Sequence, residues 1–174
     1  MSRPEHPRVA AISSLLAESG ATGRVLELTG SARTAAEAAG ELGVPLGAIA
    51  NSLLFDVDGE PLLVLTSGAH RVDVVKVAAL LGVRDVHPAS ADFVRRHTGQ
   101  PIGGVAPIGH PEPIGTLVDV ELARHGRVWA AAGHPHAVFP TSYDELLRLT
   151  EGTPAEVGAG PVATGAADAT TAAR

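Results

Sequence analysis

The sequence predicts an α+β fold in which helices are mixed with strands that pair mainly antiparallel. The dipeptide Asp58-Gly59 stands between two apolar runs, 49–57 and 61–66, and Asp-Gly is typical of the tight turn of a β-hairpin. Several other segments show apolar residues at helical spacing behind a capping residue. The chain lacks the regular strand–helix repeat of a doubly wound parallel sheet. Together these observations favour mixed structure built around antiparallel hairpins.

The elements before the hairpin alternate between helix and strand. Residues 9–16 carry apolar side chains at helical spacing and predict a first helix, and alternation over 24–28 predicts a strand. Thr34 and Glu37 form a capping box, which predicts an Ala-rich helix that ends near Gly43.

The hairpin is followed by two capped helices and then by shorter strands. Asp73 caps a predicted helix that runs to Leu81, and Ser90 opens another that runs to His97. The last predicted element is a helix that begins at the capping box of Ser142. Between the last two helices we expect short strands at 104–106, 116–118, 127–131 and 137–139.

Length and composition indicate one domain. The chain has 174 residues, of which 45% are apolar, so residues 1–151 are long enough to bury a core of their own. From 152 to 174 the sequence turns to Ala, Gly and Thr without period or large apolar residues. Such a segment buries too little surface to offset the entropy of ordering it, which predicts a disordered tail.

Charge and residue usage exclude several function classes. The net charge of −6 argues against broad binding to duplex nucleic acid, so we expect no DNA partner, although a local contact with an RNA end stays open. The absence of Cys excludes thiolate metal sites and Cys nucleophiles. No apolar run reaches the length of a membrane span, and the N-terminus has no continuous apolar stretch, so we expect a cytoplasmic protein without a membrane partner.

The most informative segment is the glycine-rich stretch 98–110, which is followed by a Gly-His-Pro turn at 133–135. The stretch holds few side chains that do chemistry, so a function there depends on exposed backbone N–H groups and a shaped pocket. This indicates binding or electrostatic catalysis. Gly103-Gly104 taken alone would also fit a bulge or the sharp entry to a strand.

Other chemical motifs are absent or weak. The chain has neither a G-x-S-x-G elbow nor a phosphate-binding G-x-x-x-x-G-K-[ST] loop. His134 and His136 would lie on one face of a strand, but no HExxH motif or second histidine pair accompanies them, so we predict no metal site. We interpret His110 and His134 as hydrogen-bonding groups of a pocket, the alternative being solvated turn residues.

In order and spacing, residues Thr34 to Thr150 resemble the YbaK/prolyl-tRNA synthetase-associated editing-domain family. The segments that carry the resemblance are Thr34-Ala35-Ala36-Glu37, Gly43-Val44-Pro45, Ile49 to Phe55, Arg71-Val72-Asp73-x-x-Lys76, Thr98-Gly99-x-x-x-Gly103-Gly104-Val105-x-Pro107-x-Gly109-His110 and Trp129 to Phe139.

The resemblance implies a fold and an activity. The fold is a mixed, largely antiparallel sheet, curved into a barrel-like form and surrounded by helices. Family members hydrolyse the ester that joins a wrong amino acid to the 3′ end of a tRNA, typically tRNA-Pro, and stand-alone members act in trans. No cofactor is implied, and the partner is the aminoacyl 3′ end of the tRNA.

The resemblance also implies roles for individual residues. Three loop residues become backbone donors for the developing oxyanion, with Asn51 as a polar anchor, because a reactive ester needs a positioned water and donors rather than a side-chain nucleophile. The donors are Gly103, Gly104 and Val105, and the substrate-binding residues are Ser52, Gly109, His110, Gly133, His134 and Pro135.

One position departs from the family pattern. The family usually has Lys before the Ser/Thr-Leu of the strand, whereas this chain has Asn51-Ser52-Leu53. Asn supplies a neutral donor and acceptor on a shorter side chain, so a charge-assisted contact is lost. The alternatives to a trans-acting deacylase are therefore a non-catalytic binder of an aminoacyl-tRNA end or small amino-acid ligand, and an ordinary interaction domain.

Overall fold

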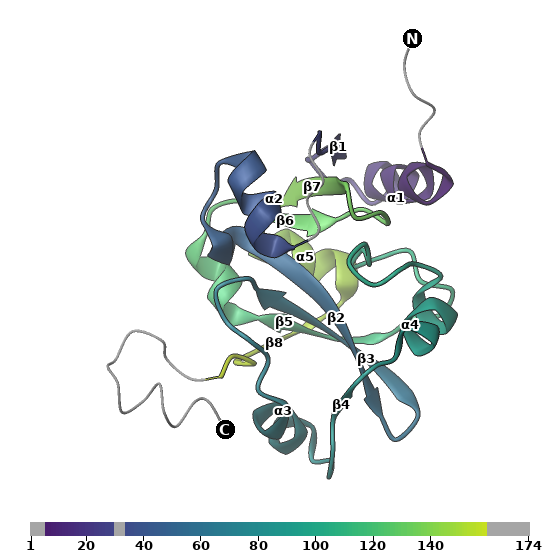
Figure 1. The fold of residues 1–174 in the computed structure, drawn as a ribbon, viewed down its shortest axis with the longest axis vertical. Helices are drawn as coiled ribbons and strands as arrows, with labels where there is room; N and C mark the ends of the chain where they lie inside the picture. The colour runs from purple at the N-terminus through teal and green to yellow at the C-terminus, as the bar shows by residue number, and fades with distance from the viewer. Residues whose placement is uncertain (1–5, 30–33, 160–174) are drawn as a thin grey trace.

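Helices cover both faces of one open, curved sheet (Figure 1). A computed structural model describes residues 6–29 and 34–159. The helices are α1 (Pro7–Glu18), α2 (Ala35–Leu42), α3 (Val74–Leu81), α4 (Ala91–Thr98) and α5 (Tyr143–Thr150), with 3₁₀ turns η1 (Leu46–Ala48) and η2 (Val120–Arg124). The strands are β1 (Leu26–Glu27), β2 (Ile49–Val57), β3 (Glu60–Ser67), β4 (His87–Pro88), β5 (Gly115–Asp119), β6 (Val128–Ala131), β7 (Ala137–Thr141) and β8 (Thr153–Ala155).

The strand order is β1-β7-β6-β2-β3-β5-β8, with β4 paired to β2 beside this path. The pairs β1/β7, β7/β6, β2/β3 and β2/β4 are antiparallel, whereas β6/β2, β3/β5 and β5/β8 are parallel. The predicted class, a mixed and largely antiparallel curved sheet with helices around it, is confirmed. The sheet stays open, because the outer strands β1 and β8 do not pair with each other.

The predicted caps form as the sequence indicated. The Thr34 hydroxyl accepts from the Glu37 N–H at 3.1 Å, and the Asp73 carboxylate accepts from two N–H groups at the start of α3. Each hydroxyl or carboxylate satisfies N–H groups that have no partner within the helix. No helix in the described part of the chain is long and apolar enough to cross a membrane.

The predicted strand at 104–106 is wrong, because its N–H groups are bonded locally. The Gly104 N–H donates to the Pro101 carbonyl at 3.0 Å, and the Ala106 N–H donates to the Gln100 side chain at 2.6 Å. A strand needs these groups for pairing with a neighbour. The segment is therefore an irregular loop that leads from α4 toward β5.

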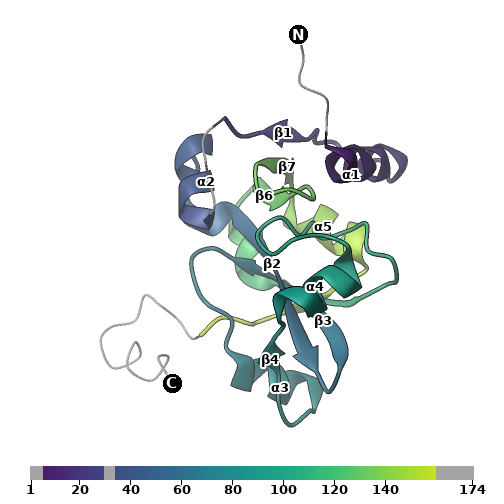
Figure 2. The same ribbon diagram turned by 45° about the vertical axis from the view of Figure 1, so that its right-hand side comes forward.

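The two faces of the sheet pack against different helices. The turned view in Figure 2 shows α1 and α2 on opposite sides of strands β6 and β7. Side chains alternate along β2, so Ala50 and Leu54 lie in the larger core with α1, α4 and α5. Phe55 lies on the opposite face, in a second core with α3, and Trp129 of β6 packs with α2 on that same side. We call these the α1/α4/α5 face and the α2/α3 face.

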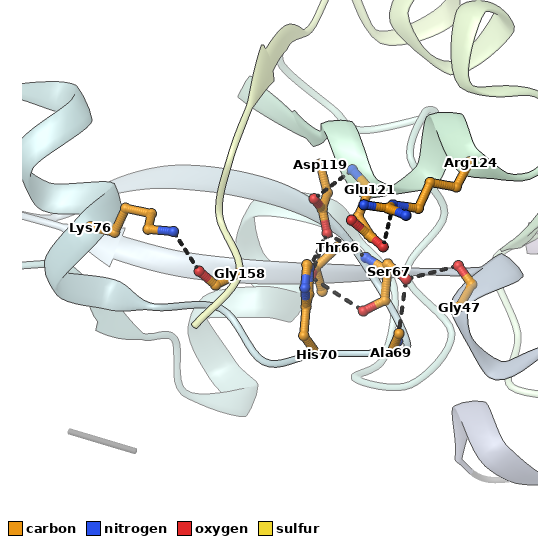
Figure 3. Close-up of polar contacts among 10 residues, drawn as sticks. All are labelled: Gly47, Thr66, Ser67, Ala69, His70, Lys76, Asp119, Glu121, Arg124 and Gly158. Carbon is orange, nitrogen blue, oxygen red and sulfur yellow. Dashed lines mark hydrogen bonds and ion pairs between the residues drawn. The ribbon is translucent and has the colours of Figure 1, made fainter. Parts of the chain in front are cut away.

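The predicted disordered tail is wrong for its first residues. Strand β8 pairs in parallel with β5, and Val157 behind it is fully buried in the second core. The Lys76 ammonium donates to the Gly158 carbonyl at 2.8 Å, and His70 pairs with Asp119 beside it (Figure 3). The remaining residues of the predicted tail, 160–174, lie outside the described residues.

This packing sets an expectation for truncation. A chain ending at Gly152 loses β8 and the buried Val157 side chain, so its free energy of unfolding should fall by about 3 kcal/mol or more. A chain ending at Ala159 keeps both and serves as the control. Thermal unfolding measures the difference, and equal melting temperatures for the two chains would contradict the role of this segment in the core.

Candidate functional site

A cavity of about 570 Å³ lies where one edge of β2 has no neighbouring strand. On that edge β6 pairs only with Ile49 and Ala50, and β4 pairs only from Phe55 onward. The cavity borders this gap and is lined by residues 34, 35, 38, 49–55, 72, 74, 88, 89, 94, 102, 103, 105, 129–131, 135 and 138. Most of these residues are apolar, which is usual for a pocket that takes a small ligand.

The gap leaves backbone polar groups of β2 unpaired. The Gly68 N–H donates to the Ile49 carbonyl at 2.8 Å. In an antiparallel pair every second residue is hydrogen-bonded to the partner strand, so the odd-numbered residues of β2 are the ones bonded to β3. In an antiparallel pair the residues between them turn their N–H and C=O the other way. The N–H and C=O of Ser52 therefore point toward the cavity, where no described strand pairs with them.

Two buried polar side chains of the cavity lining also lack a partner. The Ser52 hydroxyl and the Trp129 indole N–H are both inaccessible to solvent and make no hydrogen bond in the described part of the chain. Buried polar groups are normally bonded, so each exception indicates a missing partner. Ser52 also has no general base beside it, so it is not an activated nucleophile.

Trp129 is the functional candidate that sequence reasoning missed, since it entered only as part of a family segment. A signal was present, because Trp129 is the single Trp of a chain with very few aromatic residues. The Trp129 side chain is half-buried as a whole, but its indole N–H is fully buried and is a donor that needs a partner.

The glycine-rich loop forms one wall of the cavity and is held in shape from within. The buried Gln100 side chain accepts from the Ala106 N–H, and the His110 ring contacts the Ala106 carbonyl at 2.8 Å. The N–H groups of Gly103 and Val105 have no hydrogen-bond partner among the described residues. Both residues line the cavity, so the loop presents two free backbone donors at this wall.

Gly104 differs from its neighbours. Its N–H is already bonded to Pro101, so it is not available as a donor to a ligand. A Cβ at this position would lie 2.8 Å from the carbonyl carbon of His134 and 2.9 Å from the Pro135 nitrogen. The structure therefore gives Gly104 a spacing role, since only Gly lets the loop touch the 133–135 turn.

Four more predicted residues lie behind the cavity lining. Gly109 packs against Ile12 of α1, where a Cβ would be 2.6 Å from the Ile12 side chain, and Gly133 lies against the Arg8 backbone. His110 is held in the loop, where burial lowers the pKa of its imidazole. His134 lies in the turn outside the lining. These residues shape the loop and turn around the cavity.

Asn51 lines the cavity together with Ser52, Gly103, Val105 and Pro135. Because side chains alternate along β2, however, that of Asn51 points to the α2/α3 face. The side chain of Ser52 points to the α1/α4/α5 face, where Val105 also lies. The half-buried amide of Asn51 has no hydrogen-bond partner among the described residues. The cavity thus reaches both faces through the gap in the sheet.

Within the described residues, no group of three His, Cys, Asp or Glu side chains is placed to hold a metal ion. The arrangement instead offers an apolar chamber, free backbone groups and three unpartnered polar side chains, those of Asn51, Ser52 and Trp129. Such a chamber holds a small, partly apolar group and places donors around a carbonyl. The fold and the site thus define an α+β domain with a ligand cavity built at a sheet edge.

The chain belongs to the aminoacyl-tRNA editing domain family, whose model matches residues 29–149. It is 29% identical over 130 residues to the proline–tRNA ligase of Geobacter sulfurreducens, covering 70% of this chain and 23% of that enzyme. It is 31% identical over 140 residues to the proline–tRNA ligase of Geobacillus kaustophilus, covering 75% of this chain and 25% of that enzyme. The match thus spans about a quarter of the length of these relatives.

A solved structure described as a candidate trans-editing enzyme for prolyl tRNA synthetase is also similar. The two chains share 36% sequence identity with a TM-score of 0.84, and the match covers 89% of this chain and 99% of that one. The resemblance inferred from the sequence is therefore confirmed at the level of family and fold.

Proposed function

We propose that this protein hydrolyses the ester of a mischarged aminoacyl-tRNA in trans, with tRNA-Pro as the tRNA. The observation that carries the proposal is the ring of unpaired polar groups around the cavity: the N–H groups of Ser52, Gly103 and Val105. The family match and the similarity to a candidate trans-editing enzyme support the same activity.

In the proposed reaction a water molecule attacks the ester carbonyl carbon, the bond to the ribose oxygen breaks, and that oxygen takes up a proton. The carbonyl oxygen becomes negatively charged in the transition state, and the free backbone N–H groups stabilise it. An adjacent ribose hydroxyl of the tRNA transfers the proton, so no protein base is needed. Asn51 anchors the substrate through its unpartnered amide.

The lining favours a substrate with a small apolar side chain. Ile49, Leu53 and Val138 contribute aliphatic walls, and none of the described residues that line the cavity is charged. A charged amino-acid side chain would lose its hydration without a compensating partner there. We therefore expect amino acids with short aliphatic side chains to be removed in preference to charged ones.

The decisive experiment is a deacylation assay with a panel of tRNA-Pro species, each carrying a different amino acid. We expect release of short aliphatic amino acids well above the uncatalysed rate, and no acceleration for charged ones. An inactive but folded protein that still binds the aminoacyl-tRNA would contradict the proposal and support the second candidate, a non-catalytic binder. The neutral Asn51 in place of the usual Lys is the feature that favours that candidate.

The unpartnered groups of Ser52 and Trp129 allow a test that separates function from structure. Ser52→Ala removes only a buried polar atom that has no partner, so it should not lower the melting temperature. Trp129→Phe also removes part of a ring that packs with α2, so we expect a small loss of stability there. If these atoms bind the substrate, each variant should lose about tenfold in kcat/KM. Thr141→Ala is the matched control, because it breaks a 2.7 Å bond to Glu145 outside the cavity and should affect stability alone.

A further inference from the structure

A group of basic side chains gathers beside the cavity, where the N-terminus of α1 meets the turn between β6 and β7. The rings of His6 and His134 lie 5.2 Å apart, and those of His134 and His136 lie 5.4 Å apart. The Arg8 guanidinium donates through Nε to the Gly133 carbonyl at 3.1 Å. We call His6, Arg8, His134 and His136 the basic cluster.

The cluster is unusual in a chain with a net charge of −6. The first turn of α1 contains no acidic residue, so this turn supplies no counter-charge to the positive end of the 12-residue helix. Among described residues, Glu27 is the carboxylate that acts on His134. Burial lowers the pKa of His134, and His6, His136 and Arg8 lower it further, so these groups repel an added proton.

The hydrogen bonds of the cluster use the Nδ1 atoms of His6 and His134 and the Nε of Arg8, and leave the other ring and guanidinium nitrogens of these residues without a partner among the described residues. The Nδ1 of His6 accepts from the Arg8 N–H, and the Nδ1 of His134 accepts from the His136 N–H, both at 3.2 Å. Each neutral ring therefore carries its proton on Nε2. The terminal nitrogens of Arg8 have no partner among described residues, and its Nε bond fixes their direction. The cluster thus offers one full positive charge and two neutral donors.

We propose that the basic cluster binds a backbone phosphate of the tRNA 3′ end, with Arg8 as the charged contact and the Nε2–H groups of His6 and His134 as donors. The position fits, because the backbone of His134 and Pro135 touches Gly104 and Pro135 lines the cavity. When the aminoacyl ester lies in the cavity, the nearest phosphate is the one on the 5′ side of the terminal nucleotide, within one nucleotide of the ester. The inference rests on the proposed function for its choice of partner.

The test uses uncharged tRNA-Pro, so that binding is measured without any deacylation. Arg8→Gln should weaken the binding about tenfold at low salt, because a charge-assisted contact is lost. The slope of log Kd against log salt should also fall by about 0.7, because the variant makes one phosphate contact fewer than the parent. His6→Asn keeps an acceptor for the N-cap of α1 but removes the Nε2 donor, and should weaken binding without lowering the melting temperature.

Two controls complete the test. Helix α3 lies at the opposite end of the molecule from α1 (Figure 1). Arg84→Gln makes the same charge change just after α3 in the sequence and should bind like the parent. A tRNA without its last three nucleotides should lose the difference between the parent and Arg8→Gln. The inference is overturned if folded Arg8→Gln and His6→Asn bind tRNA with the parent's affinity and salt slope. If the parent binds tRNA more tightly than Arg8→Gln but deacylates no mischarged tRNA, the proposed reaction is refuted and the phosphate site is not.

Discussion

Gly104→Ala should abolish most of the activity and also destabilise the protein. The added Cβ would lie 2.8–2.9 Å from the backbone of His134 and Pro135, so the loop and the turn must move apart. Overpacking of this kind costs about 2 kcal/mol of unfolding free energy. A displacement of about 1 Å in the wall that carries the Gly103 and Val105 donors lowers the rate about 100-fold. Thermal unfolding and single-turnover deacylation measure the two effects.

Gly115→Ala is the control for this prediction. Gly115 lies in β5, a Cβ there would meet no atom within 4 Å, and its backbone is not in the left-handed region. The variant should change stability by less than about 0.5 kcal/mol and leave deacylation unchanged. If Gly104→Ala behaved like Gly115→Ala, the contact between the loop and the turn would have no part in shaping the cavity.

The sequence predicted well those features that depend on local chemistry. The caps at Thr34, Asp73, Ser90 and Ser142 and the turn at Asp58-Gly59 are each set by a few neighbouring residues, and all of them form. The predicted strand at 104–106 is wrong because its conformation depends on a tertiary contact. Its backbone is bonded to Gln100 through a buried side chain, and no apolar pattern reports such a bond.

The C-terminal segment shows a second limit of sequence patterns. Residues 153–158 have little apolar character of their own, yet Val157 completes a core whose other members come from distant elements. Burial here is decided by the surface that the rest of the fold leaves uncovered. A local window over the segment contains no information about that surface.

The candidate site was predicted in part for the same reasons. Five of the predicted site residues line the cavity, namely Asn51, Ser52, Gly103, Val105 and Pro135, whereas Gly104, Gly109, His110, Gly133 and His134 do not. The sequence did not predict the gap between β6 and β4, because the gap depends on where two short strands stop pairing with β2. The unpaired Ser52 backbone and the Trp129 indole become candidates only once that gap is seen.

Asn51→Lys should raise deacylation of mischarged tRNA-Pro by about 10- to 100-fold. The longer side chain brings a positive charge to a cavity whose described lining has no charged residue, where it can attract the phosphate backbone of the tRNA. A charge-assisted contact in a partly desolvated site contributes about 1.5–3 kcal/mol, which is one to two decades in rate. The gain should shrink as the salt concentration rises.

Asn51→Met is the matched control, because it extends the side chain by a similar length without adding charge. It should not raise the rate, since the apolar walls of Ile49, Leu53 and Trp129 already fill that role. The melting curve of Asn51→Lys must match that of the parent, because a buried Lys loses hydration and is driven toward its neutral form. If the folded Lys variant is no faster than a parent that deacylates none of the panel, the site is a binding pocket rather than an active site.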